Sequence, residues 1–265
     1  MEVFMRVGII YTAFNTEEYI HESLKSLIDA RQNKLDGNEF FIVAVSLPFK
    51  DFPIERRDNT QEILKYYYNA KLIDELIIEP EFIKETEART LALKKLIDNN
   101  CDISWQIDSD EFYTIEHLSK IIKFVEFNKL CTWFKISYQN FVFDTNIYLV
   151  EPFTPARIHR LKILDRDINV TANSFYEDNN ILYKDNDDNI LYWDAVMPSM
   201  IIPKNYVWIP HFAWLDNERS KKKIFYQNKR WGRSSYSWEN DHLVFNKEYF
   251  KLLNQPLPEI ATLKN

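Results

Sequence analysis

The chain has 265 residues, of which 46% are hydrophobic and 15% aromatic, enough apolar surface for a substantial packed core. Its formal net charge of −7 excludes a general nucleic-acid binder, which needs a broadly basic surface to neutralise phosphates. Two cysteines are too few for a disulfide framework, no apolar run approaches a bilayer-spanning length, and the first residues do not resemble a signal peptide, so we expect a reduced, cytoplasmic compartment.

Short apolar runs alternate with helix-like segments in the first half of the sequence. Runs rich in β-forming residues predict strands at 6–14, 40–47, 73–80 and 103–108. Helical spacing predicts helices at 15–31, 59–70 and 86–100, the first capped by Asn15 or Thr16 and the third by Thr86. This alternation predicts an α/β fold with a mostly parallel central sheet, helices on both faces, and ligands bound beyond the carboxyl ends of the strands.

The pattern changes after about Asn128, where long helices give way to a mixed, loop-rich half. Residues 130–144 look like adjacent or paired strands, and the acidic segment 176–194 looks like a long loop. The next helix-like segment is 217–231. We therefore divide one continuous domain into an α/β half, residues 1–128, and a second half, residues 129–265.

Three carboxylates stand at the end of the fourth predicted strand, in the sequence Asp108-Ser109-Asp110-Glu111. Side chains two residues apart in an extended strand point the same way, so Asp108 and Asp110 would project together if strand geometry continued. Two such carboxylates repel each other unless a cation neutralises them, and Mg²⁺ or Mn²⁺ prefers oxygen ligands. The cluster is either a cation site or an exposed acidic turn.

Two stretches around this cluster resemble the family 2 glycosyltransferases. In VGIIYTAFNTEEYIHESLKSLI, a buried strand and a small polar turn lead through Asn-x-Glu-Glu into an amphipathic helix. In ETEARTLALKKLIDNNCDISWQIDSDEF, an Arg near a helix start precedes a strand that ends in Asp-x-Asp, with Arg89 and Asp108 19 residues apart. Over roughly residues 5–115, the resemblance implies a GT-A-type fold, a nucleoside-diphosphate sugar as donor, and Mn²⁺ or Mg²⁺ held against its diphosphate.

Carried over by position, the resemblance assigns the first half to nucleotide-sugar binding and the second half to the acceptor. The end of the first strand would line the nucleotide pocket, with Thr12, Ala13 and Phe14. Asn15 and Glu17 would lie at the rim of this pocket, where helix capping is the other interpretation.

The resemblance also assigns roles at the second and fourth strands. Asp108 would approach the ribose or the sugar and, with Asp110, serve as a metal ligand. Where family members commonly end the second strand with an Asp that binds the nucleotide base, this sequence has Ser46, and Asp51 comes several residues later. Base recognition therefore stays open between uridine, which we favour, and guanosine.

Arg89 has an independent physical argument. It shares one helical face with apolar residues that include Ala92, Leu93 and Leu96. A charged side chain on an inward-facing stripe must find a partner, so we expect Arg89 to face the donor site. The alternative is an arginine that extends along the helix into solvent.

An inverting transferase needs a base that removes the acceptor's hydroxyl proton, usually a carboxylate. The candidates are Glu177, Asp178 and Asp194, and the Glu-Asp pair resembles the family's base signature, so we favour Asp178. Solvated loop acids are the alternative.

His211 ends an apolar run and is flanked by aromatic residues. Enzymes with a GT-A-type fold often supply a histidine from the C-terminal half as a further metal ligand, and this context is similar. A core histidine is the alternative.

A basic segment follows His211 in this acidic protein. Seven Lys and Arg residues lie within 15 residues, between Arg219 and Arg233, and include Lys221. Such a segment could close over a departing diphosphate. A solvated helix face and a peripheral contact with anionic lipid are the other interpretations.

The sequence thus predicts a metal-dependent, inverting glycosyltransferase that moves a sugar from a nucleoside-diphosphate sugar to a hydroxyl of a glycan, lipid or protein. The alternatives are a non-catalytic carbohydrate- or nucleotide-binding protein with the same fold and a sugar nucleotidyltransferase. The last requires a glycine-rich loop after the first strand, and only Gly8 is present there. We expect no nucleic-acid partner.

Overall fold

The computed structural model describes most of the first 142 residues and separate parts of the remainder. The described residues are 4–47, 58–78, 84–142, 147–150, 154–163, 168–169, 175–177, 180–184, 190–191, 198–214, 220–221, 224–225, 228, 234, 236–239, 242–252 and 259–262. The chain forms two compact units: Met1–Ser137 with Thr154–Ile209, and Tyr138–Phe153 with Pro210–Asn265.

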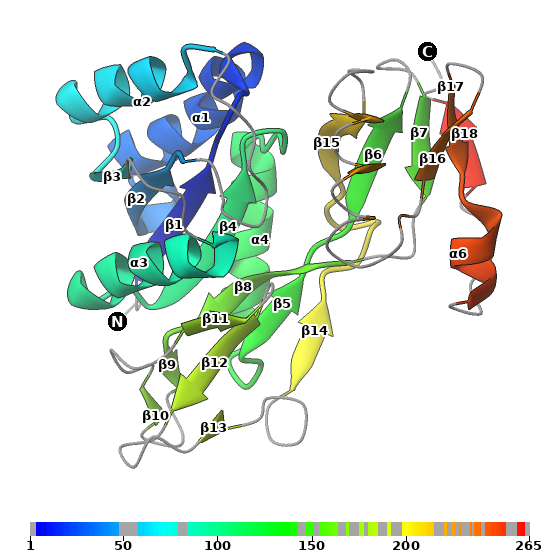
Figure 1. The fold of residues 1–265 in the computed structure, drawn as a ribbon. Helices are drawn as coiled ribbons and strands as arrows, with labels where there is room; N and C mark the ends of the chain where they lie inside the picture. Colours follow the sequence, from blue (N-terminus) through cyan, green and yellow to red (C-terminus); the bar gives the residue numbers. More distant parts are fainter. Residues whose placement is uncertain are drawn as a thin grey trace. The chain divides into compact units, whose positions relative to one another are not determined.

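A seven-stranded sheet forms the centre of the first unit (Figure 1). Its spatial order is β14-β5-β8-β4-β1-β2-β3. Neighbouring strands run parallel except where β8 pairs with β4 and with β5. The strands are β1 Arg6–Thr12, β2 Glu39–Val45, β3 Glu75–Ile77, β4 Ile103–Asp108, β5 Trp133–Lys135, β8 Ala156–Arg160 and β14 Ser199–Ile201.

Helices cover both faces of this sheet, as the alternation of the sequence predicts. The helices are α1 Glu17–Gln32, α2 Thr60–Asn69, α3 Glu85–Asp98 and α4 Ile115–Phe127, with a 3₁₀ turn η1 at Leu35–Gly37. On one face, Leu93 and Leu96 of α3 pack in a core cluster with Ile10 and Val43 of the sheet. The predicted mostly parallel, helix-covered sheet is therefore confirmed.

The starts of the helices differ from the prediction. Thr16 precedes α1, but its side chain makes no capping hydrogen bond. Instead α1 and α2 cap each other: the Glu17 amide donates to the Asp58 carboxylate at 3.0 Å, and the Asn59 amide donates to Glu17 at 2.8 Å. Thr86 as a cap is wrong, because α3 already begins at Glu85 and follows Lys84.

The predicted loop 176–194 contains strands. β11 Phe175–Glu177, β12 Asn180–Lys184 and β13 Ile190–Leu191 form an antiparallel sheet. A second small sheet pairs β9 Lys162–Ile163 with β10 Ile168–Asn169. Ile181 is fully buried in the core cluster with α3, so the apolar residues between the acidic ones are what hold this segment in the fold.

Strands at 130–144 are also confirmed, but they belong to different sheets. β5 joins the central sheet, whereas β6 lies in the second unit, in the order β15-β6-β7-β18. Among the residues that the structure describes, the second unit also contains the hairpin β16-β17 and helix α6. Their bounds are β6 Tyr138–Val142, β7 Ile147–Val150, β15 Ile209–Trp214, β16 Tyr236–Glu239, β17 His242–Phe245, α6 Lys247–Leu252 and β18 Glu259–Thr262.

Three strands of the central sheet, β5, β8 and β14, come after residue 128. The functional division at that residue stays a prediction.

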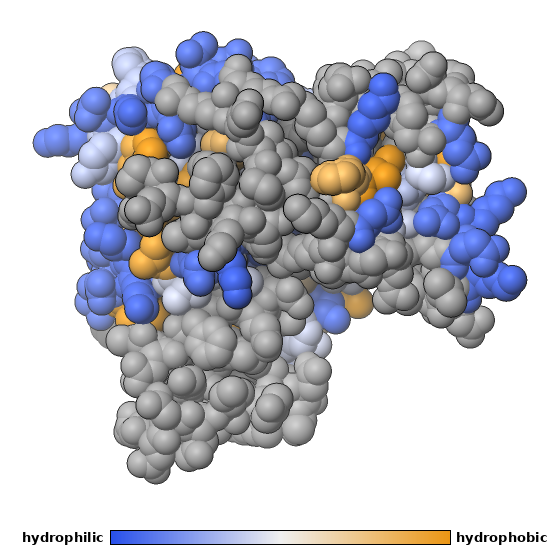
Figure 2. All heavy atoms as spheres, in the orientation of Figure 1, coloured by the Kyte–Doolittle hydropathy of each residue, from blue (hydrophilic) through white to orange (hydrophobic). Residues whose placement is uncertain are grey.

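On the face drawn in Figure 2, hydrophilic residues cover much of the described surface, and apolar residues appear as small separate areas among them. Within the described part of the chain, no helix combines the length and the apolar character needed to cross a membrane.

The core histidine of β8 makes the stability of the fold depend on pH. Burial lowers the pKa of His159, which is 1% exposed, to about 3, whereas an unfolded histidine titrates near about 6.5. Between these two values the unfolded chain binds more protons than the folded one. The free energy of unfolding should therefore fall on acidification, by up to about 1.4 kcal/mol per pH unit from this residue. Urea unfolding of the wild type and of His159→Gln measures it: the variant should show the smaller pH slope, and equal slopes would contradict the prediction.

Candidate donor site

Three parallel strands end in line at one edge of the central sheet. In the strand register, Thr12 of β1 lies opposite both Val45 of β2 and Asp108 of β4. The pairing continues one residue further, because the Ala13 amide donates to the Val45 carbonyl at 3.0 Å and the Ser109 amide donates to the Thr12 carbonyl at 2.9 Å. The structure thus brings the predicted residues of the three strand ends together.

A turn follows directly after β4. The Glu111 amide donates to the Asp108 carbonyl at 3.0 Å, so the chain reverses through Ser109 and Asp110. Strand geometry therefore does not continue to Asp110, and the condition under which Asp108 and Asp110 would project together as in a strand is not met. The Ser109 hydroxyl donates to the Thr16 hydroxyl at 2.8 Å, and this bond fixes the turn to the start of α1.

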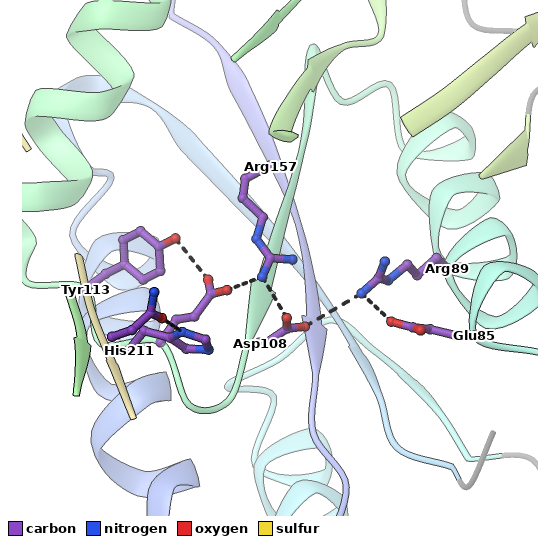
Figure 3. Close-up of polar contacts among 8 residues, drawn as sticks. Glu85, Arg89, Asp108, Tyr113, Arg157 and His211 are labelled. Carbon is purple, nitrogen blue, oxygen red and sulfur yellow. Dashed lines mark hydrogen bonds and ion pairs between the residues drawn. The ribbon is translucent and has the colours of Figure 1, made fainter. Parts of the chain in front are cut away.

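Arg157 holds the carboxylates of this turn together (Figure 3). It lies on β8, which runs antiparallel to β4 with Ile158 opposite Trp105, so it reaches the edge where β4 ends. Its guanidinium donates to the Asp108 carboxylate at 2.8 Å and also to the carboxylate of Glu111. Glu111 is fully buried and Arg157 is 7% exposed, so this ion pair is screened from water.

Arg89 reaches the same carboxylate from the other side (Figure 3). Its guanidinium lies 2.6 Å from Glu85, one turn earlier on α3, and 4.0 Å from the Asp108 carboxylate. At 5% exposure, it lies on the inward-facing stripe and not in solvent, as the helical spacing predicts. Two arginines therefore flank Asp108.

The carboxyl groups of the turn differ in their preferred charge. Burial raises the pKa of Asp108, but Arg157 and Arg89 outweigh burial and hold that pKa below its ordinary value. Burial raises the pKa of Glu111 to about 8, although Arg157 and a 3.1 Å hydrogen bond from the Tyr113 hydroxyl oppose the rise. Asp108 is thus the anion of the network, and Glu111 is an internal acceptor that readily holds a proton.

The carboxylates fit only part of a metal site. Among the described residues, no group of three or more His, Cys, Asp or Glu side chains could hold a metal ion by itself. The charge of Asp110 acts to raise the pKa of Asp108, so the two carboxyl groups of the turn interact electrostatically. Mg²⁺ in phosphate-binding sites typically takes one or two carboxylates plus substrate phosphates and waters. The residues fit an ion that a bound diphosphate would help to coordinate.

The other predicted residues occupy varied positions. Phe14 and Asn15 follow β1 and are half-buried, with Asn15 in the left-handed region at φ 53°. Ser46 is fully buried, and its backbone carbonyl accepts a hydrogen bond from the side-chain amide of Gln61 at 2.9 Å. Glu17 caps α2, as described above, and its role at the rim of the nucleotide pocket stays a prediction.

The predicted site residues of the second half lie in separate elements or outside the described residues. His211 lies on β15 of the second unit, where its Nδ1 forms a hydrogen bond with Asn140 of β6 and its ring lies 5.3 Å from that of Tyr138. Lys221 is helical and half-buried. Glu177 ends β11, while Asp178 and Asp194 lie outside the described residues. The roles of these residues stay predictions.

Sequence reasoning missed Arg157 and Tyr113, and it assigned no role to Glu111. A usable signal was present in β8, where Arg157, His159 and Arg160 interrupt a strand that is buried throughout. Buried charges require partners, so each of these arginines predicts an acceptor elsewhere in the chain. Arg160 donates hydrogen bonds to backbone carbonyls, including that of Cys131 at 2.9 Å, whereas Arg157 donates to the carboxylates of the turn after β4.

Comparison with known proteins finds a similar fold in a solved structure. No protein-family profile and no curated protein sequence matches the chain. The mannosyltransferase PcManGT from Pyrobaculum calidifontis, solved with GDP-Man and Mn²⁺, aligns with 88% of this chain at 12% identity and a TM-score of 0.50. Residues 1–349 of TarS from S. aureus align with 59% of the chain at 22% identity and a TM-score of 0.40. Glucosyl-3-phosphoglycerate synthase from Mycobacterium tuberculosis aligns with 51% at 17% identity and a TM-score of 0.34.

The class of protein that these observations define is a structural one: the chain has a GT-A-type α/β fold. It covers 47% of the TarS fragment and 66% of the mannosyltransferase, so it spans about half to two thirds of those proteins. At these identities the likeness concerns the fold alone.

Removal of Arg157 tests the charge network of the site. Arg157→Met leaves buried carboxyl groups without their shared cation, which should lower the free energy of unfolding by about 3–5 kcal/mol. Adding Asp108→Asn should restore part of the loss, because the carboxyl group that carries the negative charge of the network is then neutral. Urea unfolding of the single and double variants measures the coupling.

An exposed ion pair provides the matched control for this cycle. Lys34 lies 3.0 Å from Glu39, and their side chains are 66% and 54% exposed. Lys34→Met should change the free energy of unfolding by less than about 1 kcal/mol. A similar loss in Arg157→Met and Lys34→Met would show that Arg157 is not the cation on which the turn depends.

Proposed function

We propose that this protein is a metal-dependent glycosyltransferase that moves a sugar from a nucleoside-diphosphate sugar to a hydroxyl acceptor. The observation that carries the proposal is the convergence of three strand ends on Asp108 and Asp110, with Arg89 and Arg157 fixed around Asp108. Ligands of open α/β sheets bind at this edge. The GT-A-type fold and the sequence resemblance around residues 5–115 both support a nucleotide-sugar donor there.

The two aspartates have different roles in this proposal. Asp108 is oriented by two arginines, so it is a fixed acceptor for hydroxyls of the donor's ribose or sugar. Asp110 is the principal protein ligand of Mn²⁺ or Mg²⁺, with Asp108 adjoining. When bound, the ion would offset the charge that develops on the departing diphosphate. Thr12, Ala13 and Phe14 would line the nucleotide pocket beside Ser46.

The second half would supply the acceptor chemistry. A carboxylate, which we assign to Asp178 ahead of Glu177 and Asp194, takes the proton from the acceptor hydroxyl. The acceptor oxygen then attacks the anomeric carbon with inversion, and the bond to the diphosphate breaks. His211 would be a further metal ligand, and Lys221 with its basic neighbours would balance the charge of the leaving group.

One observation favours a second candidate, a non-catalytic nucleotide-sugar-binding protein. The arginines already neutralise Asp108 without any metal ion, which is the arrangement a metal-independent binder would need.

A sugar nucleotidyltransferase has less support, because that class requires a glycine-rich loop after the first strand and Gly8 has another explanation. A Cβ on Gly8 would lie 2.7 Å from a Leu96 methyl carbon and 2.9 Å from the Ile103 carbonyl, so this glycine is explained by the packing of α3 on β1.

A thermal-shift and calorimetry screen of nucleoside diphosphates and their sugars, with and without Mn²⁺, separates these candidates. A ligand at about 100 times its Kd stabilises the folded state by about 2.7 kcal/mol, which raises Tm by several degrees. We expect UDP or its sugars to bind in the presence of Mn²⁺, with GDP compounds as the alternative. Asp110→Asn should abolish the metal-dependent part of the affinity.

Asp98→Asn is the matched control, because Asp98 is exposed near the end of α3. It should bind like the wild type. Equal binding with and without Mn²⁺ would favour the non-catalytic candidate. The glycosyltransferase proposal fails if no nucleoside diphosphate or sugar nucleotide shows metal-dependent binding.

A further inference from the structure

Two neighbouring turns of the first unit expose large apolar side chains beside lysines. One turn, residues 127–130, begins at the last residue of α4 and exposes 88% of Phe127 and 72% of Leu130. The other, residues 203–206, follows β14 and exposes 38% of Tyr206. We call residues 127–130 and 203–206 the basic turn patch.

The two turns adjoin and enclose a groove. The rings of Phe124 and Tyr206 lie 5.8 Å apart, which ties the end of α4 to the second turn. Phe127 and Asn128 line one side of a groove of ≈ 570 Å³, and Asn205 and Tyr206 line the other. The patch is therefore a continuous surface and not two separate exposed residues.

The charge of the patch is opposite to that of the protein. Lys129 and Lys204 are exposed within the turns, and Lys204 lies 5.7 Å from the Trp208 ring. No Asp or Glu occurs in residues 127–137 or 198–209, in a chain whose formal net charge is −7. Apolar side chains therefore stand among positive charges, with no acidic residue in either of these two segments.

β14 adds one exposed apolar side chain at the edge of the sheet, which does not line the groove. It is the edge strand of the central sheet, and 51% of Ile201 is exposed on it. The four apolar side chains, Phe127, Leu130, Ile201 and Tyr206, are still too few for a stable dimer, which buries about 800 Å² per partner. A second copy of an acidic chain is therefore a poor occupant.

We propose that the basic turn patch binds the surface of an anionic membrane. Phe127 and Leu130 would enter the boundary between headgroups and acyl chains, where exposed aromatic and aliphatic side chains are stabilised. Lys129 and Lys204 would contact the acidic headgroups. This site is independent of the proposed donor function and differs from the basic segment around Lys221.

Vesicle sedimentation tests the proposal on the full chain. The protein should sediment with vesicles of equal parts phosphatidylcholine and phosphatidylglycerol and not with phosphatidylcholine alone. The double variant Lys129→Glu/Lys204→Glu should bind the anionic vesicles more weakly by at least about 20-fold, since each lysine contributes about fivefold. Phe127→Ser/Leu130→Ser should weaken binding by about tenfold or more.

Lys25→Glu/Lys94→Glu is the matched control. It changes the net charge by the same amount on exposed positions of α1 and α3, so it should retain vesicle binding, and all variants should keep the wild-type Tm. The proposal is overturned if the wild type ignores anionic vesicles or if the control loses binding equally. It is also overturned if Phe127→Ser/Leu130→Ser converts a lipid-free dimer to a monomer, because the patch would then join two copies.

Discussion

The bond from Arg157 to Asp108 and Glu111 is the interaction on which the candidate site depends. Three carboxyl groups follow a buried strand, and each of the three residues is buried or partly buried. Without a cation inside the fold, their mutual repulsion and desolvation would oppose this packing. Because β8 runs antiparallel to β4, it brings Arg157 to the end of β4, and the turn through Asp110 can form in the interior.

The carboxyl groups of the turn differ in how their neighbours hold them. Asp108 is fixed by Arg157 and is flanked by Arg89, while burial raises the pKa of the Glu111 carboxyl group. In the proposed function, a cation bound together with a diphosphate would meet a site already organised around one anion. The electrostatic change on binding would fall mainly on Asp110, the carboxylate for which we propose metal ligation, and not on the packing of the sheet.

Local sequence patterns predicted the parts of the fold that depend on local spacing. Apolar runs located β1, β2 and β4, and helical spacing located α1 and α3 with the inward-facing Arg89, because these patterns report which face of an element is buried. A turn at Ser109 was one of two interpretations of the cluster, but its attachment to Thr16 could not be predicted, because that hydrogen bond joins residues of different elements. The strands within 176–194 were missed because acidic residues obscured short apolar runs that pack on α3.

Arg157 shows why the rest of the site could not be predicted. It lies 49 residues after Asp108, on a strand whose antiparallel register with β4 no local pattern specifies. The resemblance to glycosyltransferases ends near residue 115, so it could not indicate this partner either. The predicted nucleotide-sugar half, residues 1–128, therefore lacks the cation that balances its own carboxylates. The candidate donor site consequently includes β8, a strand that follows residue 128.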